Sequence, residues 1–191
     1  MELIAATNLK VESIEKQVGI ANKETKILFG LDSTSEFFKY VQLDGRRLSI
    51  KGATTAGWFP VFLSRIPIHK RQYYEIELTA FNNKLLAVGI TTMENRNKLN
   101  MYYNQGSSVL WLYGNYGASV GGLKTETNYN GSAGDVLRVT VDLVDYTVEW
   151  EMTRPNSMKI ASVSIPENLR QNELYPYLDF HYQFDGIVTV L

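Results

Sequence analysis

From about residue 37 onward, apolar and polar residues alternate in short segments, and this pattern limits the possible folds more than any other property of the sequence. In residues 73–79, the side chains of Tyr74, Ile76 and Leu78 share one face, and in residues 137–143 every second residue is again apolar. Successive side chains of a β-strand point to opposite faces, so this period predicts half-buried strands. Turn residues separate the segments, which favours a sandwich or a barrel over alternating β and α units.

Two turns and one apolar run predict local details. The dipeptide Asp44-Gly45 lies between residues 41–43 and 47–50 and predicts a hairpin, because both positions can adopt positive φ. A second reversal near Val144-Asp145 joins residues 137–143 to residues 146–152. The continuous apolar run at residues 58–63 predicts a core strand. Further strands are expected at residues 85–91, 109–113, 161–165, 175–180 and 186–191.

Residues 1–36 lack this clean period. A short helix at residues 11–18 and a short strand at residues 26–31 are expected, followed by a polar connection at residues 32–36. The chain of 191 residues suits one all-β domain. The expected organisation is an N-terminal extension at residues 1–36 and a β-sandwich at residues 37–191.

Charge and cysteine content narrow the function classes. Lys and Arg number 19, Asp and Glu number 20, and the net charge is −1, so nucleic acid is not an expected partner. No polybasic run or long apolar stretch predicts contact with a membrane. Cysteine is absent and the N-terminus has no signal-peptide pattern, so a cytoplasmic or other intracellular location is expected.

A series of short motifs follows one order from about Val41 to Leu191 and resembles the SPRY domain. No single tripeptide is specific, but the ordered set is, because chance matches would not keep order and spacing. The motifs are Gly57-Trp58-Phe59, residues 73–77, Val88-Gly89-Ile90, Leu110-Trp111-Leu112, Gly134-Asp135-Val136 before Val141-Asp142-Leu143, Thr147-Val148 and Leu174-Tyr175-Pro176.

The resemblance implies an all-β fold: an antiparallel β-sandwich of the SPRY, concanavalin-like type, with a short N-terminal extension. It also implies a protein-interaction module, an adaptor or a subunit of a larger complex, that binds a partner protein or peptide through loops at one end of the sandwich. The aromatic anchor is expected to be Phe184 or Tyr182. The partner-binding loops implied by the resemblance contain Lys51, Gly52, Ala53, Thr54, Thr92, Met93, Glu94, Asn95, Arg154, Asn156, Tyr182, Gln183, Phe184 and Asp185.

The chain has little that predicts catalysis. His69 and His181 are the two histidines, and neither stands in a metal-binding spacing. Asp135 and Asp142 are formally a carboxylate pair, but turn and surface roles are favoured for them. Neither an enzyme, a cofactor nor a metal site is therefore expected.

A carbohydrate-binding, lectin-like domain is the alternative function. It would need exposed ring faces and often a calcium site. Asn128, Asn130 and Asp135 are the nearest approach to such a site, in a spacing that matches no known loop. The candidate stacking residues are Tyr102, Tyr103, Tyr116 and Tyr129.

Overall fold

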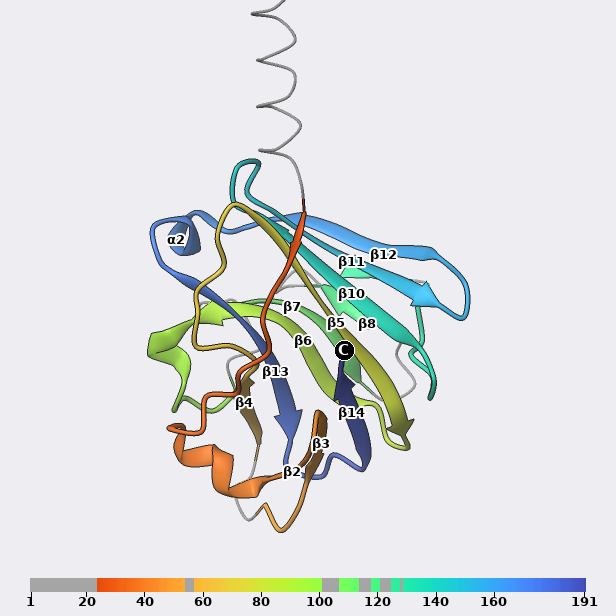
Figure 1. Cartoon of the computed structure of the whole chain (residues 1–191). Helices are drawn as coiled ribbons and strands as arrows, with labels where there is room; N and C mark the ends of the chain where they lie inside the picture. Colours follow the sequence, from red (N-terminus) through yellow and green to blue (C-terminus); the bar gives the residue numbers. More distant parts are fainter. Residues whose placement is uncertain (1–23, 54–56, 101–106, 114–117, 121–124, 128) are drawn as a thin grey trace, which may run out of the picture.

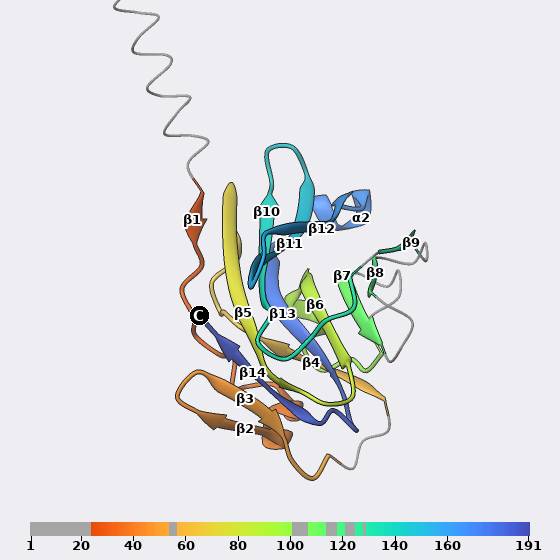
Figure 2. The ribbon, with the colours of Figure 1, turned by 90° about the vertical axis from the view of Figure 1, so that its right-hand side faces the viewer.

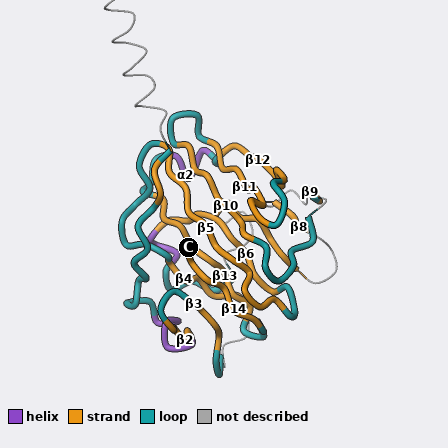
Figure 3. The backbone as a smooth tube through the Cα atoms, turned by 45° about the vertical axis from the view of Figure 1, so that its right-hand side comes forward, coloured by secondary structure: helices purple, strands orange, loops and turns teal. Residues whose placement is uncertain are grey.

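The computed structural model describes residues 24–53, 57–100, 107–113, 118–120, 125–127 and 129–191. The described chain consists of two antiparallel β-sheets packed face to face (Figure 1). Helix is limited to three short segments in the described residues, η1 (Glu36–Tyr40), η2 (Met93–Asn95) and α2 (Glu167–Arg170), as Figure 3 shows. The expected all-β sandwich is confirmed.

The two sheets differ in size. In spatial order, the larger sheet contains β12 (Met158–Ser164), β11 (Thr147–Arg154), β10 (Val136–Asp142), β5 (Arg71–Phe81), β14 (Gly186–Val190), β3 (Arg47–Ile50) and β2 (Val41–Asp44). The smaller sheet contains β4 (Trp58–Phe62), β13 (Leu174–His181), β6 (Leu85–Thr92), β7 (Ser107–Tyr113), β8 (Ala118–Val120) and β9 (Thr125–Glu126). The predicted strands correspond to these elements, with ends displaced by a few residues.

Apolar side chains from the facing sides of the two sheets fill the space between them. Trp150 is fully buried there, and its indole Nε1 donates a hydrogen bond to the carbonyl oxygen of Val88 at 2.9 Å. The hydroxyl of Tyr74 donates to the carbonyl oxygen of Gly89 at 2.7 Å. These two bonds join the larger sheet to β6, so polar atoms inside the core are satisfied across the sandwich.

The first hairpin turns one residue later than predicted. Asp44 pairs with Arg47, so the turn is Gly45-Arg46 rather than Asp44-Gly45. Gly45 has φ 61°, a conformation that favours glycine. The second predicted hairpin, between β10 and β11, is confirmed.

Part of the N-terminal segment packs on the sandwich. β1 (Thr25–Lys26) runs parallel to β5, beside the part of β5 that β14 does not reach (Figure 2). The expected strand at residues 26–31 is wrong beyond Lys26, although Ile27, Phe29 and Leu31 contact the core. The expected helix at residues 11–18 lies outside the described residues, and the division at residue 36 stays a prediction.

Candidate functional site

Three of the predicted loops lie at one end of the sandwich. The segment after β13 follows His181, and the amide of Tyr182 donates to the carbonyl oxygen of Gly57 at 2.9 Å. The segment after β3 begins at Lys51, beside the start of β14, because β3 and β14 are antiparallel. Thr54 lies outside the described residues. We define the end-loop surface by residues Lys51, Gly52, Ala53, Asn82, Asn83, Gln183 and Asp185.

The turn between β5 and β6 was absent from the predicted set, yet it holds this surface together. The side-chain oxygen of Asn83 accepts a hydrogen bond from the Asp185 amide at 3.0 Å, and its Nδ2 donates to the Gln183 carbonyl oxygen. The Asn82 amide donates to the Asp185 carbonyl oxygen at 3.0 Å. Gln183 and Asp185 are nevertheless exposed, so the loop is fixed in place with its side chains in solvent.

The β11–β12 loop lies at the same end of the larger sheet but farther out. Arg154 pairs with Val136, which pairs with Glu77 near the end of β5. β10 separates β11 from β5, so this loop is about 10 Å to the side of β5. Arg154 and Asn156 are exposed.

The predicted loop at residues 92–95 lies at the opposite end of the smaller sheet. Thr92 pairs with Leu174 at the start of β13, whereas the end-loop surface follows the end of β13. Asn95 is 3% exposed and donates to Thr91 Oγ1 at 2.9 Å, whereas Glu94 is exposed. The predicted residues therefore do not form one face, because antiparallel pairing places successive loops at opposite ends.

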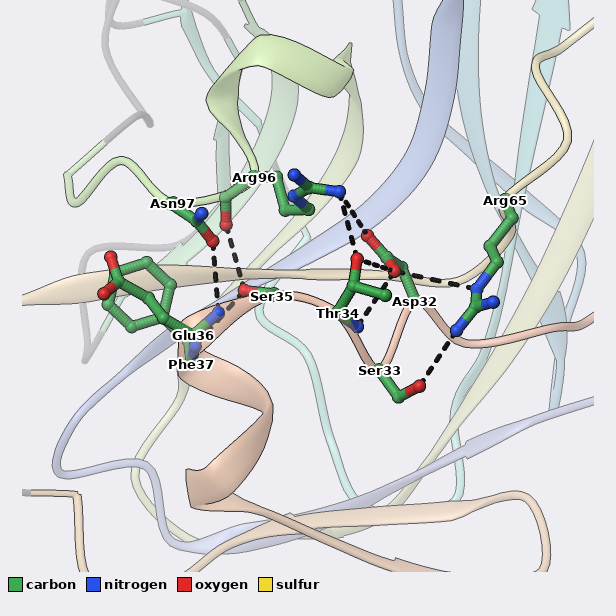
Figure 4. A network of polar contacts seen from close by, with 9 residues as sticks. All are labelled: Asp32, Ser33, Thr34, Ser35, Glu36, Phe37, Arg65, Arg96 and Asn97. Atoms are coloured by element: carbon green, nitrogen blue, oxygen red, sulfur yellow. Dashed lines mark hydrogen bonds and ion pairs between the residues drawn. The ribbon is translucent and has the colours of Figure 1, made fainter.

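The N-terminal segment covers the backbone that continues from residues 92–95 (Figure 4). Ser35 Oγ donates to the carbonyl oxygen of Arg96 at 3.0 Å, and the Glu36 amide donates to Asn97 Oδ1 at 3.1 Å. The carbonyl oxygen of Arg96 and the side-chain oxygen of Asn97 therefore already accept hydrogen bonds from within the chain.

Asp32 is at the centre of this contact (Figure 4). Its carboxylate accepts hydrogen bonds from the amide and the hydroxyl of Thr34 at 3.0 and 2.6 Å. Arg65 and Arg96 lie 3.6 and 3.7 Å from its oxygens. Burial alone would raise the pKa of Asp32, but the Thr34 hydrogen bonds and the two guanidinium groups lower it below its ordinary value.

The expectation that Phe184 is an exposed anchor is wrong. Phe184 is 5% exposed, and its ring contacts Phe180 edge-on at 4.9 Å and Phe81 at 6.2 Å. The chain turns back sharply after β13, and the turn directs this ring into the space between the sheets. Tyr182 is partly buried and packs against the same core, with its ring 4.5 Å from the His181 ring.

A second apolar cluster covers the outer face of the smaller sheet. It contains the buried side chains of Trp58, Phe62, Ala87, Val109, Tyr175 and Tyr177. On β13, Leu178 and Phe180 face the core between the sheets, whereas Tyr175 and Tyr177 face outward. The side chains of Tyr175 and Tyr177 on the outward side of β13 are therefore buried, like those of Leu178 and Phe180 on its inward side. We call this cluster, with Trp111, Asp179 and His181, the outer aromatic face.

Two tryptophans approach each other across this face. β4 and β7 are three strand spacings apart, about 14 Å, because β13 and β6 lie between them. The rings of Trp58 on β4 and Trp111 on β7 nevertheless lie 5.3 Å apart. The edge of the His181 ring also contacts Trp58 at 5.3 Å. Both indoles thus extend over the intervening strands.

Asp179 lies on the same face of the sheet, in the cross-strand row of Trp111. It pairs with Pro60 on one side and with Ala87 on the other, and Ala87 pairs with Trp111. Asp179 is fully buried, and among the described residues neither of its carboxylate oxygens has a hydrogen-bond partner.

Burial dominates the titration of this face. It raises the pKa of Asp179 well above its usual range, so the protonated form is favoured. Burial also raises the pKa of Tyr177 well above its ordinary value, and the nearby Asp179 contributes to this rise. Burial lowers the pKa of His181, which favours the neutral imidazole. A neutral carboxylic acid in an aromatic surrounding can accept or donate a hydrogen bond, and it ionises beside a cation.

The predicted set did not include Asp179, although the sequence held a signal. Asp179 is the charged residue within the apolar run at residues 174–180. Carboxylates inside fully buried strands are rare unless they are paired. The alternation alone did not show that both faces of this strand are buried.

The residues considered above for a glycosidase pair or for sugar stacking have structural roles where the structure describes them. The carboxylate of Asp135 accepts hydrogen bonds from Tyr129 and the Ser132 amide, and that of Asp142 accepts from two amides of the turn after β10. They lie at opposite ends of β10, about 20 Å apart, too far for a glycosidase pair. Tyr129 is 3% exposed, and the other candidate stacking tyrosines lie outside the described residues. Among the described residues, no group of three or more His, Asp or Glu side chains is placed to hold a metal ion.

The amino-acid sequence matches no protein-family model, and no curated protein matches it. Solved structures do resemble the fold. The TRIM65 PSpry domain matches with a TM-score of 0.65 and 12% identity, over 87% of this chain and 93% of that one. The SPRY domain of human HERC1 matches with a TM-score of 0.58 and 18% identity, over 84% of this chain and 96% of that one.

Stonustoxin contains a similar unit, with a TM-score of 0.60 and 16% identity over 87% of this chain. The match spans 27% of the stonustoxin chain. These similarities identify a SPRY-like fold and confirm the resemblance seen in the sequence at the level of the fold. No helix in the described part of the chain is long and apolar enough to cross a membrane.

Proposed function

We propose that this chain is a non-catalytic protein-interaction module that acts as an adaptor or as a subunit of a larger assembly. It binds a partner protein or peptide, rather than nucleic acid or membrane, through the end-loop surface, with Arg154 and Asn156 at its margin. The proposal includes an intracellular location. The SPRY-like fold supports the protein-binding class, since loops held on a rigid scaffold are where recognition usually occurs.

The observation that carries the proposal is the arrangement of the end-loop surface. Its backbone is fixed by the hydrogen bonds of Asn82 and Asn83, while Gln183, Asp185 and Lys51 are exposed. Because its backbone is already fixed, this surface loses little backbone conformational entropy when a partner binds. No observation on the described residues favours the carbohydrate-binding alternative.

Affinity purification of the tagged chain from its native cells tests the proposal. One protein is expected to co-purify reproducibly, and the triple variant Lys51→Ala, Gln183→Ala, Asp185→Ala is expected to lose it. The matched control is Glu94→Ala, an exposed residue at the opposite end of the sheet, which is expected to retain the partner.

Unchanged urea denaturation of the triple variant would establish that it is folded. Retention of the partner by the folded triple variant, or loss by Glu94→Ala, would contradict binding through the end-loop surface. The absence of any reproducible protein partner would contradict the adaptor function itself.

A further inference from the structure

Ser33 is an exposed serine whose hydroxyl already lies against a positive charge (Figure 4). Its Oγ accepts a hydrogen bond from Nη2 of Arg65 at 2.9 Å. The Arg65 side chain is 54% exposed, and its other polar contact among the described residues is an ion pair of its Nε with Asp32 at 3.6 Å. Because a guanidinium group has five N–H donors, Arg65 has further donors for an anion at Ser33.

Three hydroxyl residues stand in a row in this segment, and their contacts distinguish them. Ser35 is 7% exposed, and its hydroxyl donates to the carbonyl oxygen of Arg96. Thr34 is exposed, but its hydroxyl donates to the Asp32 carboxylate at 2.6 Å, so an anion attached there would lie against that carboxylate. Of the three, Ser33 is the one that is exposed and whose hydroxyl has an arginine as its described partner.

The network around Asp32 has more positive than negative charge. Arg65 and Arg96 lie 3.6 and 3.7 Å from its oxygens, so two guanidinium groups face one carboxylate. A phosphate on a serine has about two negative charges at pH 7 and three acceptor oxygens, and it forms charge-assisted hydrogen bonds with a nearby arginine. Arg65 faces Asp32 with Nε and Ser33 with Nη2, so the carboxylate and such a phosphate would contact different nitrogens.

The sequence after Ser33 suits recognition by a protein kinase. Glu36 stands three residues after Ser33 and is exposed. Kinases select their substrates partly by complementary patterns of charge, so an exposed carboxylate close to the serine favours a kinase with a basic substrate groove.

A phosphate at Ser33 would act on the attachment of the N-terminal segment. The Asp32 amide donates to the carbonyl oxygen of Phe62 at 3.2 Å, at the end of β4. Arg65 belongs to the connection that follows β4, so a phosphate that pairs with it would hold the N-terminal segment more firmly on the sandwich. The end-loop surface adjoins Gly57, before β4 begins, so the two sites lie at opposite ends of this strand.

We propose that Ser33 is a phosphorylation site and that its phosphate pairs with Arg65. A protein kinase transfers the γ-phosphoryl group of a nucleoside triphosphate: an O–P bond forms at Ser33 Oγ, the bond from the γ-phosphorus to the leaving nucleoside diphosphate breaks, and the hydroxyl proton passes to the catalytic base of the kinase. The phosphate has more and stronger acceptors than the hydroxyl, so it tightens the attachment of the N-terminal segment. The proposal goes beyond the adaptor function and does not depend on it.

The chain purified from its native cells in the presence of phosphatase inhibitors tests the modification. Trypsin releases Ser33, Thr34 and Ser35 in one peptide, residues 27–39, and fragmentation mass spectrometry locates a phosphate among them. Phosphate on Ser33 is expected. A peptide without phosphate, or with phosphate on Thr34 or Ser35 instead, would overturn the proposal.

The recombinant full chain with phosphoserine incorporated at position 33 tests the contact with Arg65. Arg65→Gln is the matched variant, since it removes the charge and keeps a hydrogen-bond donor. In a phosphorus magnetic-resonance titration, the second pKa of the phosphate, ordinarily about 6, is expected to be roughly 0.5 lower with Arg65 than in Arg65→Gln, because a guanidinium group favours the dianion. Equal pKa values in the two backgrounds would overturn the pairing.

Urea denaturation of the same proteins, each with and without the phosphate, measures the attachment. The phosphate is expected to raise the folding equilibrium constant roughly fivefold with Arg65 and to lose this effect in Arg65→Gln, and comparison within each background cancels the direct cost of the substitution. Phosphoserine at position 162 is the control, since Ser162 is exposed but pairs with Glu149, so a phosphate there is not expected to stabilise. An equal gain at both positions, or an undiminished gain in Arg65→Gln, would overturn the assignment of Arg65 as the partner of the phosphate.

Discussion

Asp32 and Asp179 are two buried carboxylates in opposite situations. Asp32 is 4% exposed and receives two hydrogen bonds from Thr34, with Arg65 and Arg96 within 4 Å of its oxygens. Asp179 is fully buried, and none of the described residues donates a hydrogen bond to it. Their pKa values accordingly move in opposite directions, downward for Asp32 and upward for Asp179.

The difference lies in what each carboxyl group contacts. Arg65 belongs to the β4–β5 connection and Arg96 follows η2, so the charge of Asp32 holds the N-terminal segment on the sandwich (Figure 4). Asp179 has no hydrogen-bond partner among the described residues, and a buried polar group in that situation lowers stability. Denaturation of matched variants tests this difference.

The largest effect is expected when the indole of Trp58, diagonally across the strand pair from Asp179, is removed. Trp58→Ala deletes a ring that is 4% exposed and is expected to lower the free energy of unfolding by roughly 3–5 kcal/mol in urea denaturation. Water would then reach Asp179, so Asp179→Asn should no longer be stabilising in the Trp58→Ala background. An undiminished effect of Asp179→Asn there would show that the indole does not shield it.

Asp32→Asn is expected to destabilise the protein by about 2 kcal/mol at pH 7, because it removes the charge that pairs with Arg65 and Arg96. The folded-state pKa of Asp32 lies below its ordinary value of 3.8. Its contribution is therefore present above about pH 4 and is lost as pH falls through the folded-state pKa. Urea denaturation at several pH values checks this.

Asp44→Asn is the control for that measurement, since Asp44 is exposed on β2. Its effect should stay within about 0.5 kcal/mol. A loss of similar size at both positions would mean that the network around Asp32 contributes no more than an exposed charge.

Asp179→Asn is expected to have the opposite sign and to stabilise the protein by about 1 kcal/mol at pH 7. The unfolded chain releases this proton near 3.8, whereas the folded protein holds it to higher pH. The wild type therefore loses stability as pH rises through that interval, and the advantage of the variant grows from near zero at pH 4 toward neutral pH.

The other titratable side chains that the structure describes on this face in β4, β13, β6 and β7 are Tyr175, Tyr177 and His181. Thermal or urea denaturation of the two proteins at pH 4 and pH 7 measures the difference. A destabilised variant at pH 7 would mean that Asp179 has a partner like those of Asp32.

The smallest effect is expected at Glu75, a carboxylate in a partly exposed network. Its oxygens lie 2.9 Å from Arg138 and 3.1 Å from Lys26, and these partners lower its pKa. Glu75→Gln should cost about 0.5 kcal/mol at low salt and less at high salt. Glu149→Gln, which removes an exposed pair with Lys159, should be close to neutral, and equal losses at both would contradict the special position of Glu75.

Much of the fold was predictable because alternation records which side of a strand is buried. The strands around Tyr74 and Trp150, the reversal near Val144 and the buried run beginning at Trp58 all follow from local pattern. The turn at Gly45 was misplaced by one residue because the pairing of Asp44 with Arg47 depends on strand register. Register depends on how two neighbouring strands pair, and the residues of one strand do not specify it.

The candidate site was less predictable. The resemblance seen in the sequence assigned four loops to one binding face. Because the strands pair in antiparallel fashion, residues 92–95 lie at the opposite end of the smaller sheet. Phe184 follows a strand in an exposed-looking polar segment, yet the turn directs it between Phe81 and Phe180. Which way a ring faces after a turn depends on backbone dihedral angles that composition does not specify.

The amino-acid sequence alone predicts a cysteine-free β-sandwich of the SPRY type, since short-range alternation and ordered motifs are local properties. The folded structure adds that Asp179 is fully buried, that the rings of Trp58 and Trp111 meet, and that Asp32 is paired. Strand order β4-β13-β6-β7 brings together residues that lie 53 to 121 positions apart from one another or from Asp179. The pKa of a carboxylate follows from those neighbours, and neighbours across a sheet are determined by folding of the whole chain.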